Sequence, residues 1–142
     1  MRAGECRRIM PQTPPRHVFV YGTLRRGGRN DINRLHPAPD YVGMGEVRGV
    51  LYQFDWYPGL ALGGEQAVTV VGEIYRITPA LEAVLDGIEC VEPGPDSEYF
   101  KREVAVATEG GTVECLVYEI NPSRVIGREP IGHGDWILFH SG

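Results

Sequence analysis

The chain has 142 residues, a length typical of a single domain with a substantial buried core. Lys and Arg total 14 and Asp and Glu total 19, so the formal net charge is −5 at pH 7. This acidic balance argues against a nucleic-acid partner, because binding a polyanion requires a basic face.

The N-terminal segment, residues 1–15, is rich in prolines towards its end and is expected to be a loose tail in front of one domain at residues 16–142. It lacks the apolar run of a secretory signal peptide, and no segment of the chain approaches the length of a membrane-spanning helix. The three cysteines include no C-x-x-C pair, which favours a reducing compartment over a disulfide framework. We therefore expect a cytoplasmic protein without a membrane partner.

Short strands with turn residues between them are predicted at residues 17–24, 46–54 and 67–77. Residues 55–66 read DWYPGLALGGEQ, and their Gly and Pro content predicts a loop. A short helix is predicted at about residues 29–35.

The clearest helix signal is TPALEAVLDGIE, at residues 78–89. Thr78 can cap the first turn, and Pro79 suits the first helical position, where its missing N–H costs no hydrogen bond. Gly87 weakens the last turn and predicts fraying there. One apolar face at helical spacing is formed by Leu81, Val84, Leu85 and Ile88.

Two further strands are predicted at residues 100–108 and 112–120, on either side of a Glu-Gly-Gly hairpin signal at residues 109–111. Residues 136–139, which read WILF, are a candidate sixth strand. Five or six strands at this spacing predict a barrel or a curled sheet.

The first strand runs directly into GTLRRGG, at residues 22–28. The spacing is that of a Walker loop, but Gly28 and Arg29 stand where Lys and Ser or Thr are required, so no nucleotide site is predicted. The N–H groups of such a turn are not used by a strand ladder and can bind an anion or a carbonyl oxygen. We expect Gly22 at this place because a side chain would keep the backbone away from a bound molecule. The alternative is a tight turn with solvated arginines.

A carboxyl group at the margin of the helix's apolar face is the second candidate feature. Glu89 lies about 40° beyond Leu85 on a helical wheel and can therefore point into a cavity. Glu82 lies about 20° farther round, so the wheel does not choose between the two glutamates. The alternative for either is a solvated helix flank, and Asp86 is expected to point outward or lie in the following loop.

Other catalytic chemistries have little support in the sequence. His17, His36, His133 and His140 lack the spacing of metal ligands, so no metal and no other cofactor are expected. Cys90 has no histidine nearby in the sequence and is expected to be a buried thiol. No G-x-S-x-G element supports a serine nucleophile.

Six short stretches occur in order between His17 and Trp136: VFVYGTLRRGG, YPGL, VVGEIYRI, LDGIE, CLVYEI and GDW. As an ordered set they resemble the γ-glutamylcyclotransferase-like (AIG2-like) family. The resemblance implies an α+β fold, a compact and mostly antiparallel β-barrel of five or six strands with one or two short helices. It also implies cleavage of γ-glutamyl amides by internal cyclisation, which releases 5-oxoproline and an amine.

The resemblance extends to individual residues. The glutamate of the Leu-Asp-x-x-Glu element, Glu89, looks like the family's acid/base residue. The Tyr-Gly-x-Leu turn is similar to the loop that holds the γ-glutamyl group, and a tyrosine of the penultimate strand faces the pocket in some members. Substrate contacts are thereby implied for Tyr21, Gly22, Thr23, Leu24 and Tyr118.

The chain departs from the family pattern at three places. One is the stretch GRNDINRL at residues 28–35, which lacks the polar pattern expected in some subgroups. Cys90 stands where relatives often have glycine, and either Tyr99 or Phe100 fits an aromatic position that precedes basic residues. These departures leave the identity of the leaving amine open. The arginine cluster, Arg25, Arg26 and Arg29, either attracts a substrate carboxylate or is solvated.

The predicted function is that of a γ-glutamyl amide cyclotransferase, in which the substrate's α-amine attacks its own γ-carbonyl with Glu89 as general acid/base. The partner is then a small γ-glutamyl amine, and the resemblance is compatible with a homodimer. Two alternatives stand beside this prediction. One is a non-catalytic barrel that binds a small carboxylated ligand. The other is an enzyme that removes a γ-glutamyl protecting group from a biosynthetic intermediate or a protein crosslink.

Overall fold

The computed structural model describes residues 16–54, 57–89, 91 and 94–136. The predictions for the tail at residues 1–15, for Cys90 and for most of the candidate strand 136–139 lie outside the described residues. Among the helices that are described, none is long and apolar enough to cross a lipid bilayer.

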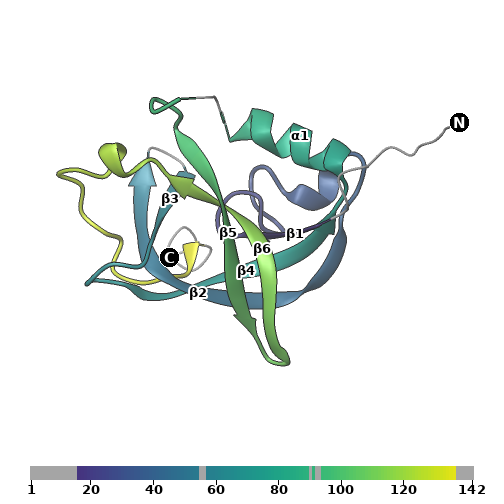
Figure 1. Ribbon diagram of the computed structural model, residues 1–142, viewed down its shortest axis with the longest axis horizontal. Coiled ribbons are helices and arrows are strands. Elements are labelled where there is room, and N and C mark those ends of the chain that lie inside the picture. The colour runs from purple at the N-terminus through teal and green to yellow at the C-terminus, as the bar shows by residue number, and fades with distance from the viewer. Residues whose placement is uncertain (1–15, 55–56, 90, 92–93, 137–142) are drawn as a thin grey trace, which may run out of the picture.

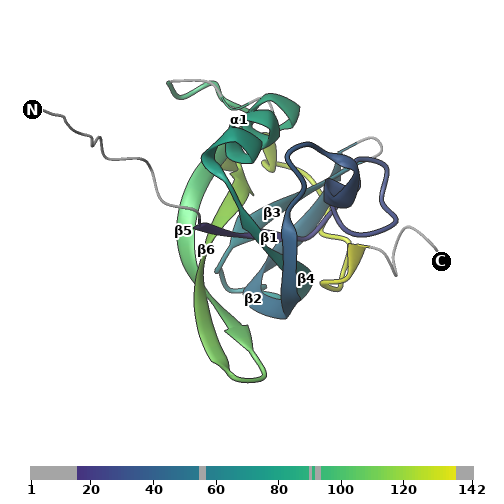
Figure 2. The same ribbon diagram turned by 90° about the vertical axis from the view of Figure 1, so that its right-hand side faces the viewer.

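Five strands form a closed mixed barrel (Figure 1, Figure 2). They follow one another around the barrel in the order β2-β4-β1-β6-β5, and a bridge between Glu46 and Ala107 joins β5 back to β2. Only the β1–β6 pairing is parallel among these described strands. The strands are β1 (Arg16–Val20), β2 (Asp40–Phe54), β4 (Val68–Ile77), β5 (Tyr99–Thr108) and β6 (Gly111–Ile120).

Two further features complete the fold. Strand β3 (Tyr57–Leu62) pairs with the second half of β2 and extends the sheet. Helix α1 (Pro79–Ile88) lies across one end of the barrel, while the tip of the β5–β6 hairpin projects from the opposite end (Figure 1, Figure 2). The expected α+β barrel of five or six strands with few helices is confirmed.

Strand β1 is central because it is buried on both faces. Val18 and Val20 pack in one apolar cluster with Leu85 of α1, whereas Phe19 packs in a second cluster with Val117. Successive side chains of a strand point to opposite faces. A strand with core on both sides therefore reads as a continuous apolar run, as HVFVY does.

The structure corrects two strand predictions. Strand β1 ends at Val20 and not at residue 24, because the chain turns away from the barrel there. Strand β3 lies within residues 55–66, which were predicted to be a loop. Pro58 is tolerated in β3 because β3 is the edge strand of the described sheet, where one side of the backbone makes no ladder. The predicted strands at 46–54, 67–77, 100–108 and 112–120 correspond to β2, β4, β5 and β6.

Helix α1 begins as its sequence predicts. The Thr78 side chain accepts a hydrogen bond from the N–H of Leu81 at 3.2 Å, and Pro79 occupies the first turn. The helix continues through Gly87, where fraying was expected, to Ile88. The predicted short helix at residues 29–35 is a single 3₁₀ turn, Ile32–Arg34.

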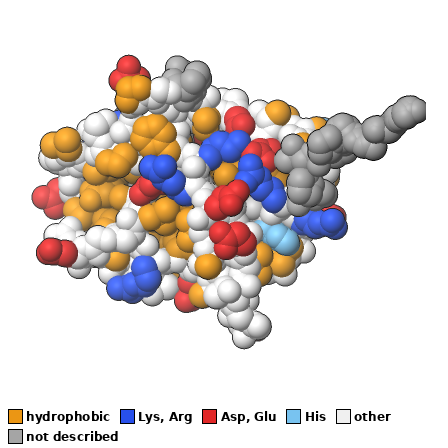
Figure 3. Space-filling view, in the orientation of Figure 1, with side chains coloured by type: hydrophobic (Ala, Val, Ile, Leu, Met, Phe, Trp, Pro, Cys, Tyr) orange, Lys and Arg blue, Asp and Glu red, His pale blue; other side chains and the backbone are white. Residues whose placement is uncertain are grey.

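The apolar face of α1 differs from the predicted one. Leu81 and Leu85 are fully buried, but Val84 is 38% exposed. Glu82 is buried instead, because its carboxylate receives two hydrogen bonds from Arg16, at 2.8 and 2.7 Å, and one from Lys101. The hydrogen bond from Arg16 is the main reason why the pKa of Glu82 is lowered. Figure 3 shows acidic and basic side chains interspersed where α1 meets the β5–β6 hairpin.

This packing predicts unequal effects of two truncations on the same helix. Leu85→Ala removes a fully buried side chain and should lower the free energy of unfolding by about 3 kcal/mol. Val84→Ala should change it by less than about 0.5 kcal/mol, because Val84 is partly exposed and Ala favours a helix. Urea denaturation of both variants measures the difference. Equal losses would mean that α1 packs through a different face.

Candidate active site

The turn at residues 21–24 follows β1 directly and folds back on itself. The main-chain carbonyls of Gly22, Thr23 and Leu24 accept hydrogen bonds from the N–H groups of Arg25 at 3.0 Å, Asn30 at 2.9 Å and Ile32 at 2.9 Å, in that order. Among the described residues, the N–H groups of these three turn residues find no acceptor. Free N–H groups of such a turn can bind an anion or a carbonyl oxygen.

The glycine of this turn is required by packing. A Cβ atom on Gly22 would lie 2.4 Å from Cγ of Pro58, which is far inside contact distance. We expected Gly22 to admit a bound molecule, but the first obstacle to a side chain is Pro58 of β3. Gly28 is similarly restricted, since its Cβ would lie 2.3 Å from the carbonyl oxygen of Thr23.

A buried ion pair holds the turn against β4. The guanidinium of Arg25 contacts the carboxylates of Glu73 and Asp135, each at 3.1 Å, and Arg25 is only 6% exposed. Glu73 also accepts hydrogen bonds from the N–H of Arg26 at 2.9 Å and from the hydroxyl of Tyr75 at 2.7 Å. Arg25 therefore neither attracts substrate nor lies in solvent, the two alternatives expected for the arginine cluster.

The other two arginines of the cluster are exposed and do not line the cavity described below. The guanidinium of Arg26 lies 4.9 Å from the centre of the Tyr41 ring, a typical cation–π distance. We therefore expect Arg26 and Arg29 to act on the surface and not on a ligand inside the barrel.

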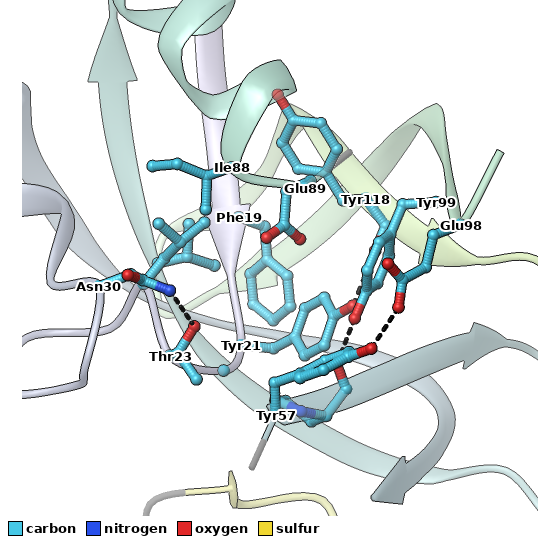
Figure 4. Close-up of a pocket in the computed structure, with 14 residues that line it drawn as sticks. Phe19, Tyr21, Thr23, Asn30, Tyr57, Ile88, Glu89, Glu98, Tyr99 and Tyr118 are labelled. Carbon is cyan, nitrogen blue, oxygen red and sulfur yellow. Dashed lines mark hydrogen bonds between the residues drawn. The ribbon is translucent and has the colours of Figure 1, made fainter. Parts of the chain in front are cut away.

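A cavity of about 160 Å³ opens beside the turn, between it and the end of α1 (Figure 4). Its wall combines aromatic rings with a few polar groups. The lining residues are Phe19, Val20, Tyr21, Gly22, Thr23, Leu24, Asn30, Tyr57, Pro58, Ile88, Glu89, Glu98, Tyr99 and Tyr118. The structure thus brings together all six residues to which the family resemblance assigned a role.

Glu89 is the residue at which α1 ends, and its N–H donates to the carbonyl of Leu85 at 2.9 Å. Figure 4 shows its carboxylate pointing into the cavity, towards Tyr21. Among the described residues, no hydrogen bond reaches this carboxylate. Burial raises the pKa of Glu89 to about 8, and the charge of Glu98 adds to the effect. A carboxyl group with this pKa can both accept and return a proton near neutral pH.

The tyrosine hydroxyls nearest the turn are already engaged. Tyr21 donates to the carbonyl of Tyr118 at 2.8 Å and accepts from the N–H of Leu60 at 3.2 Å. Tyr99 donates to the carbonyl of Pro58 at 2.6 Å. Burial raises the pKa of both Tyr21 and Tyr99 well above its ordinary value. Their rings therefore serve as neutral walls. Of the two candidates for the aromatic position, Tyr99 lines the cavity and Phe100 is not among its lining residues.

Tyr118 lines the cavity with its ring, and its hydroxyl donates to the carboxylate of Asp86 at 2.7 Å. Asp86 in turn accepts from Lys101 at 3.0 Å. We expected Asp86 to point outward or to lie in a loop, but it is in α1 and orients a cavity residue. The expectation failed because the helical wheel does not include the neighbouring strands, which supply both partners of Asp86.

Sequence reasoning did not assign a role to Asn30, Tyr57 or Glu98, which also line the cavity. Asn30 donates from its side chain to the Thr23 hydroxyl at 3.2 Å, and Tyr57 donates to the carboxylate of Glu98. Tyr57 belongs to the YPGL stretch, so the sequence identified its motif. The sequence did not indicate that Tyr57 lies in the cavity wall. Nothing in the local sequence of Glu98 distinguishes it from a surface glutamate.

Comparisons with known proteins identify relatives over most of the chain. A family model described as "Gamma-glutamyl cyclotransferase, AIG2-like" matches residues 18–138. A Vibrio cholerae protein, named provisionally as a gamma-glutamylcyclotransferase, is 34% identical over 121 residues, 84% of this chain and 93% of that protein. The Bos taurus gamma-glutamylaminecyclotransferase is 33% identical over 114 residues, 71% of this chain and 63% of that protein. The crystal structure of an AIG2-like protein from Mus musculus aligns with a TM-score of 0.66 and 27% identity, over 85% of this chain and 88% of that one.

The buried ion pair predicts a large stability effect at Glu73. Glu73→Ala leaves buried Arg25 with Asp135 as its single ion-pair partner among the described residues. This variant should lower the free energy of unfolding by about 3 kcal/mol or more. Glu103→Ala removes an exposed partner of Arg16 and should cost less than about 1 kcal/mol. Thermal or urea unfolding measures both. A small loss for Glu73→Ala would show that the turn is not held by this pair.

The raised pKa of Glu89 predicts a pH-dependent cost to stability. The ordinary pKa of a glutamate is 4.5, whereas that of Glu89 in the folded protein is about 8, so the folded state binds this proton more tightly. The stability that this proton provides is complete below pH 4.5 and is lost as the pH rises through 8. Glu89→Gln cannot ionise. In urea denaturation, its free energy of unfolding should equal that of the wild type near pH 4.5. At pH values above 8, its free energy of unfolding should be larger than that of the wild type.

The control for this experiment is Glu109→Gln, which changes an exposed glutamate in the β5–β6 turn. The difference in free energy of unfolding between this variant and the wild type should be the same at both ends of the pH range. If Glu89→Gln behaves in the same way, the carboxylate of Glu89 is not shielded from water.

Proposed function

The chain belongs to the gamma-glutamyl cyclotransferase, AIG2-like family, and we propose that it cleaves γ-glutamyl amides by cyclisation, releasing 5-oxoproline and a free amine. Family membership and the curated relatives support γ-glutamylcyclotransferase-type activity. The proposal of cleavage by cyclisation rests on the position of Glu89. This carboxyl group has a raised pKa and lies in a cavity whose opposite wall is the 21–24 turn.

The reaction needs little from the protein beyond positioning. The substrate's α-amine attacks its own γ-carbonyl, a new C–N bond closes a five-membered lactam, and the original amide C–N bond breaks. Because nucleophile and electrophile are tethered, effective molarities of about 10⁵ M or more are available once the folded conformer is held. The cavity of about 160 Å³ is suited to holding a small folded group of this kind.

Glu89 supplies both proton transfers in this mechanism. Its carboxylate takes one proton from the substrate's ammonium group, which frees the amine to attack, and the resulting acid gives that proton to the leaving nitrogen. Glu89 then accepts the second proton, which the attacking nitrogen loses as the lactam forms. The released amine takes up this proton and leaves as an ammonium ion. One group can do both efficiently when its pKa lies near the working pH. The value of about 8 meets this requirement, and its cause is burial among apolar and aromatic neighbours.

The free N–H groups of Gly22, Thr23 and Leu24 supply hydrogen-bond donors to the substrate. In the proposed complex they bind the oxygen on which negative charge develops or the carboxylate of the γ-glutamyl group. Preoriented donors of this kind cost no reorganisation during the reaction, and loss of one typically costs about 3 kcal/mol of transition-state stabilisation. The buried Arg25–Glu73 pair holds the turn against β4 and so keeps these N–H groups in their orientation.

The cavity wall also protects the reaction from water. The rings of Phe19, Tyr21, Tyr99 and Tyr118 line it, and the three tyrosine hydroxyls are occupied by protein acceptors. Exclusion of water limits the competing hydrolysis of the amide and strengthens the electrostatic interactions inside. Removal of a γ-glutamyl protecting group from a larger molecule uses the same chemistry and differs only in the leaving amine.

Mass spectrometric detection of 5-oxoproline over a panel of γ-glutamyl amides tests the proposal. Glu89→Gln should lower kcat/KM by about 100-fold to 10,000-fold, because it removes the only proposed proton carrier. For the wild type, kcat/KM should rise with pH and reach half of its plateau near pH 8. Glu109→Gln, an exposed substitution far from the cavity, should leave the activity unchanged.

A second substrate series tests whether the substrate's own α-amine is the nucleophile. Acetylation of the substrate's α-amine should abolish product formation, because the acetylated nitrogen cannot attack. Full activity of Glu89→Gln, or cleavage of the acetylated substrate, would contradict the mechanism. Binding across the panel without any turnover would instead favour the non-catalytic barrel.

A further inference from the structure

The cavity contains a second carboxylate, and the proposed proton transfers do not use it. Glu98 lies just before β5 and accepts a hydrogen bond from the hydroxyl of Tyr57. Its main-chain carbonyl accepts from the N–H of Asn121 at 2.8 Å, so the backbone at Glu98 is also held. Figure 4 shows Glu98 on the Tyr57 side of the cavity, away from Thr23.

Glu98 lies where the cavity meets the molecular surface. Tyr57 and Glu98 line the cavity and also line a neighbouring open groove, together with Phe54, Arg124 and Arg128. If the 21–24 turn holds the γ-glutamyl group, the leaving amine is the part of the substrate that extends towards this groove. Glu98 is then a charged group beside the leaving amine.

The charges around a bound substrate do not balance. Among the described lining residues there is no Lys, Arg or His, while Glu89 and Glu98 are both acidic. A γ-glutamyl group brings one ammonium and one carboxylate, so it adds no net charge. When Glu89 takes the proton of the ammonium, both groups become neutral, and the charge of Glu98 still has no counterpart from the cavity wall.

We propose that Glu98 selects γ-glutamyl amides whose leaving amine carries a second, positively charged group, such as a diamine, over those whose leaving amine carries a carboxylate. This proposal rests on the proposed function. A distant ammonium supplies the missing counter-charge, whereas a carboxylate adds a third negative charge to the site. The cationic group also favours the ionised, proton-accepting form of Glu89.

Arg124 and Arg128, which line the open groove, favour the opposite preference, for a leaving amine that carries a carboxylate. The guanidinium of Arg128 lies 4.1 Å from the centre of the Phe54 ring and donates to the carbonyls of Arg124 and Gln53. Arg124 donates to the carbonyl of Asp96 at 3.2 Å. Both arginines are exposed, so solvent and salt screen their charges more strongly than that of half-buried Glu98.

Three substrates with the same four-carbon leaving chain test the proposal: the γ-glutamyl amides of 1,4-diaminobutane, n-butylamine and 4-aminobutanoate. They end in an ammonium, a methyl and a carboxylate group. The expected order of kcat/KM is ammonium, then methyl, then carboxylate, with about tenfold between the two extremes, which corresponds to about 1.4 kcal/mol. Raising the ionic strength should reduce the differences in kcat/KM among the three substrates, because salt screens the charge of Glu98.

Glu98→Gln should bring the three kcat/KM values together, because the charge is removed while an oxygen remains to accept from Tyr57. The matched control is Asp96→Asn in the same loop. Asp96 is exposed and is not among the cavity-lining residues, so this variant has the same charge change and should keep the wild-type order.

The outcomes separate this inference from the proposed function. If none of the three amides gives 5-oxoproline, the proposed function fails and this inference fails with it. If they are turned over with equal kcat/KM, or with the carboxylate form fastest, this inference alone is overturned. It is also overturned if Glu98→Gln retains the wild-type order.

Discussion

The chemistry proposed for this protein depends on limiting the contact between water and one carboxyl group, that of half-buried Glu89. Glu89 is placed by α1, which packs on the barrel through Leu81 and Leu85 and ends at the cavity. The C-terminal end of a helix disfavours negative charge, and none of the described residues offers this carboxylate a hydrogen bond to replace water. Ionised Glu89 therefore lowers the stability of the folded protein, as is common where a catalytic group must have an altered pKa.

The 21–24 turn is organised so that the N–H groups of Gly22, Thr23 and Leu24 have no acceptor among the described residues. The turn satisfies its own carbonyls through Arg25, Asn30 and Ile32, and the buried Arg25–Glu73 pair fixes it against β4. A buried ion pair is weak evidence of net stabilisation, because both groups lose their hydration. Here its clearest consequence is geometric: it joins the segment that follows the turn to Glu73 of β4.

Much of the fold could be predicted from local patterns because strands and helices have characteristic periods and turn residues. The cap at Thr78, the β5–β6 hairpin and the two-sided burial of β1 all follow from such patterns. Strand β3 was missed because Pro58 and its glycines are typical of loops, and only pairing with β2 makes them a strand. Val84 was misplaced because a helical wheel does not show that Arg16 and Lys101 make burial of Glu82 favourable.

The sequence by itself determined the family resemblance, the type of fold and the candidate residues Tyr21, Gly22, Thr23, Leu24, Glu89 and Tyr118, because these depend on residue types at fixed spacing. Only the tertiary structure decided that they share one cavity, that Arg25 is a buried anchor and that Glu98 joins Glu89. Burial and charge coupling are properties of neighbours in space. Residues such as Tyr57 and Glu98, 41 positions apart, become neighbours only when the barrel closes.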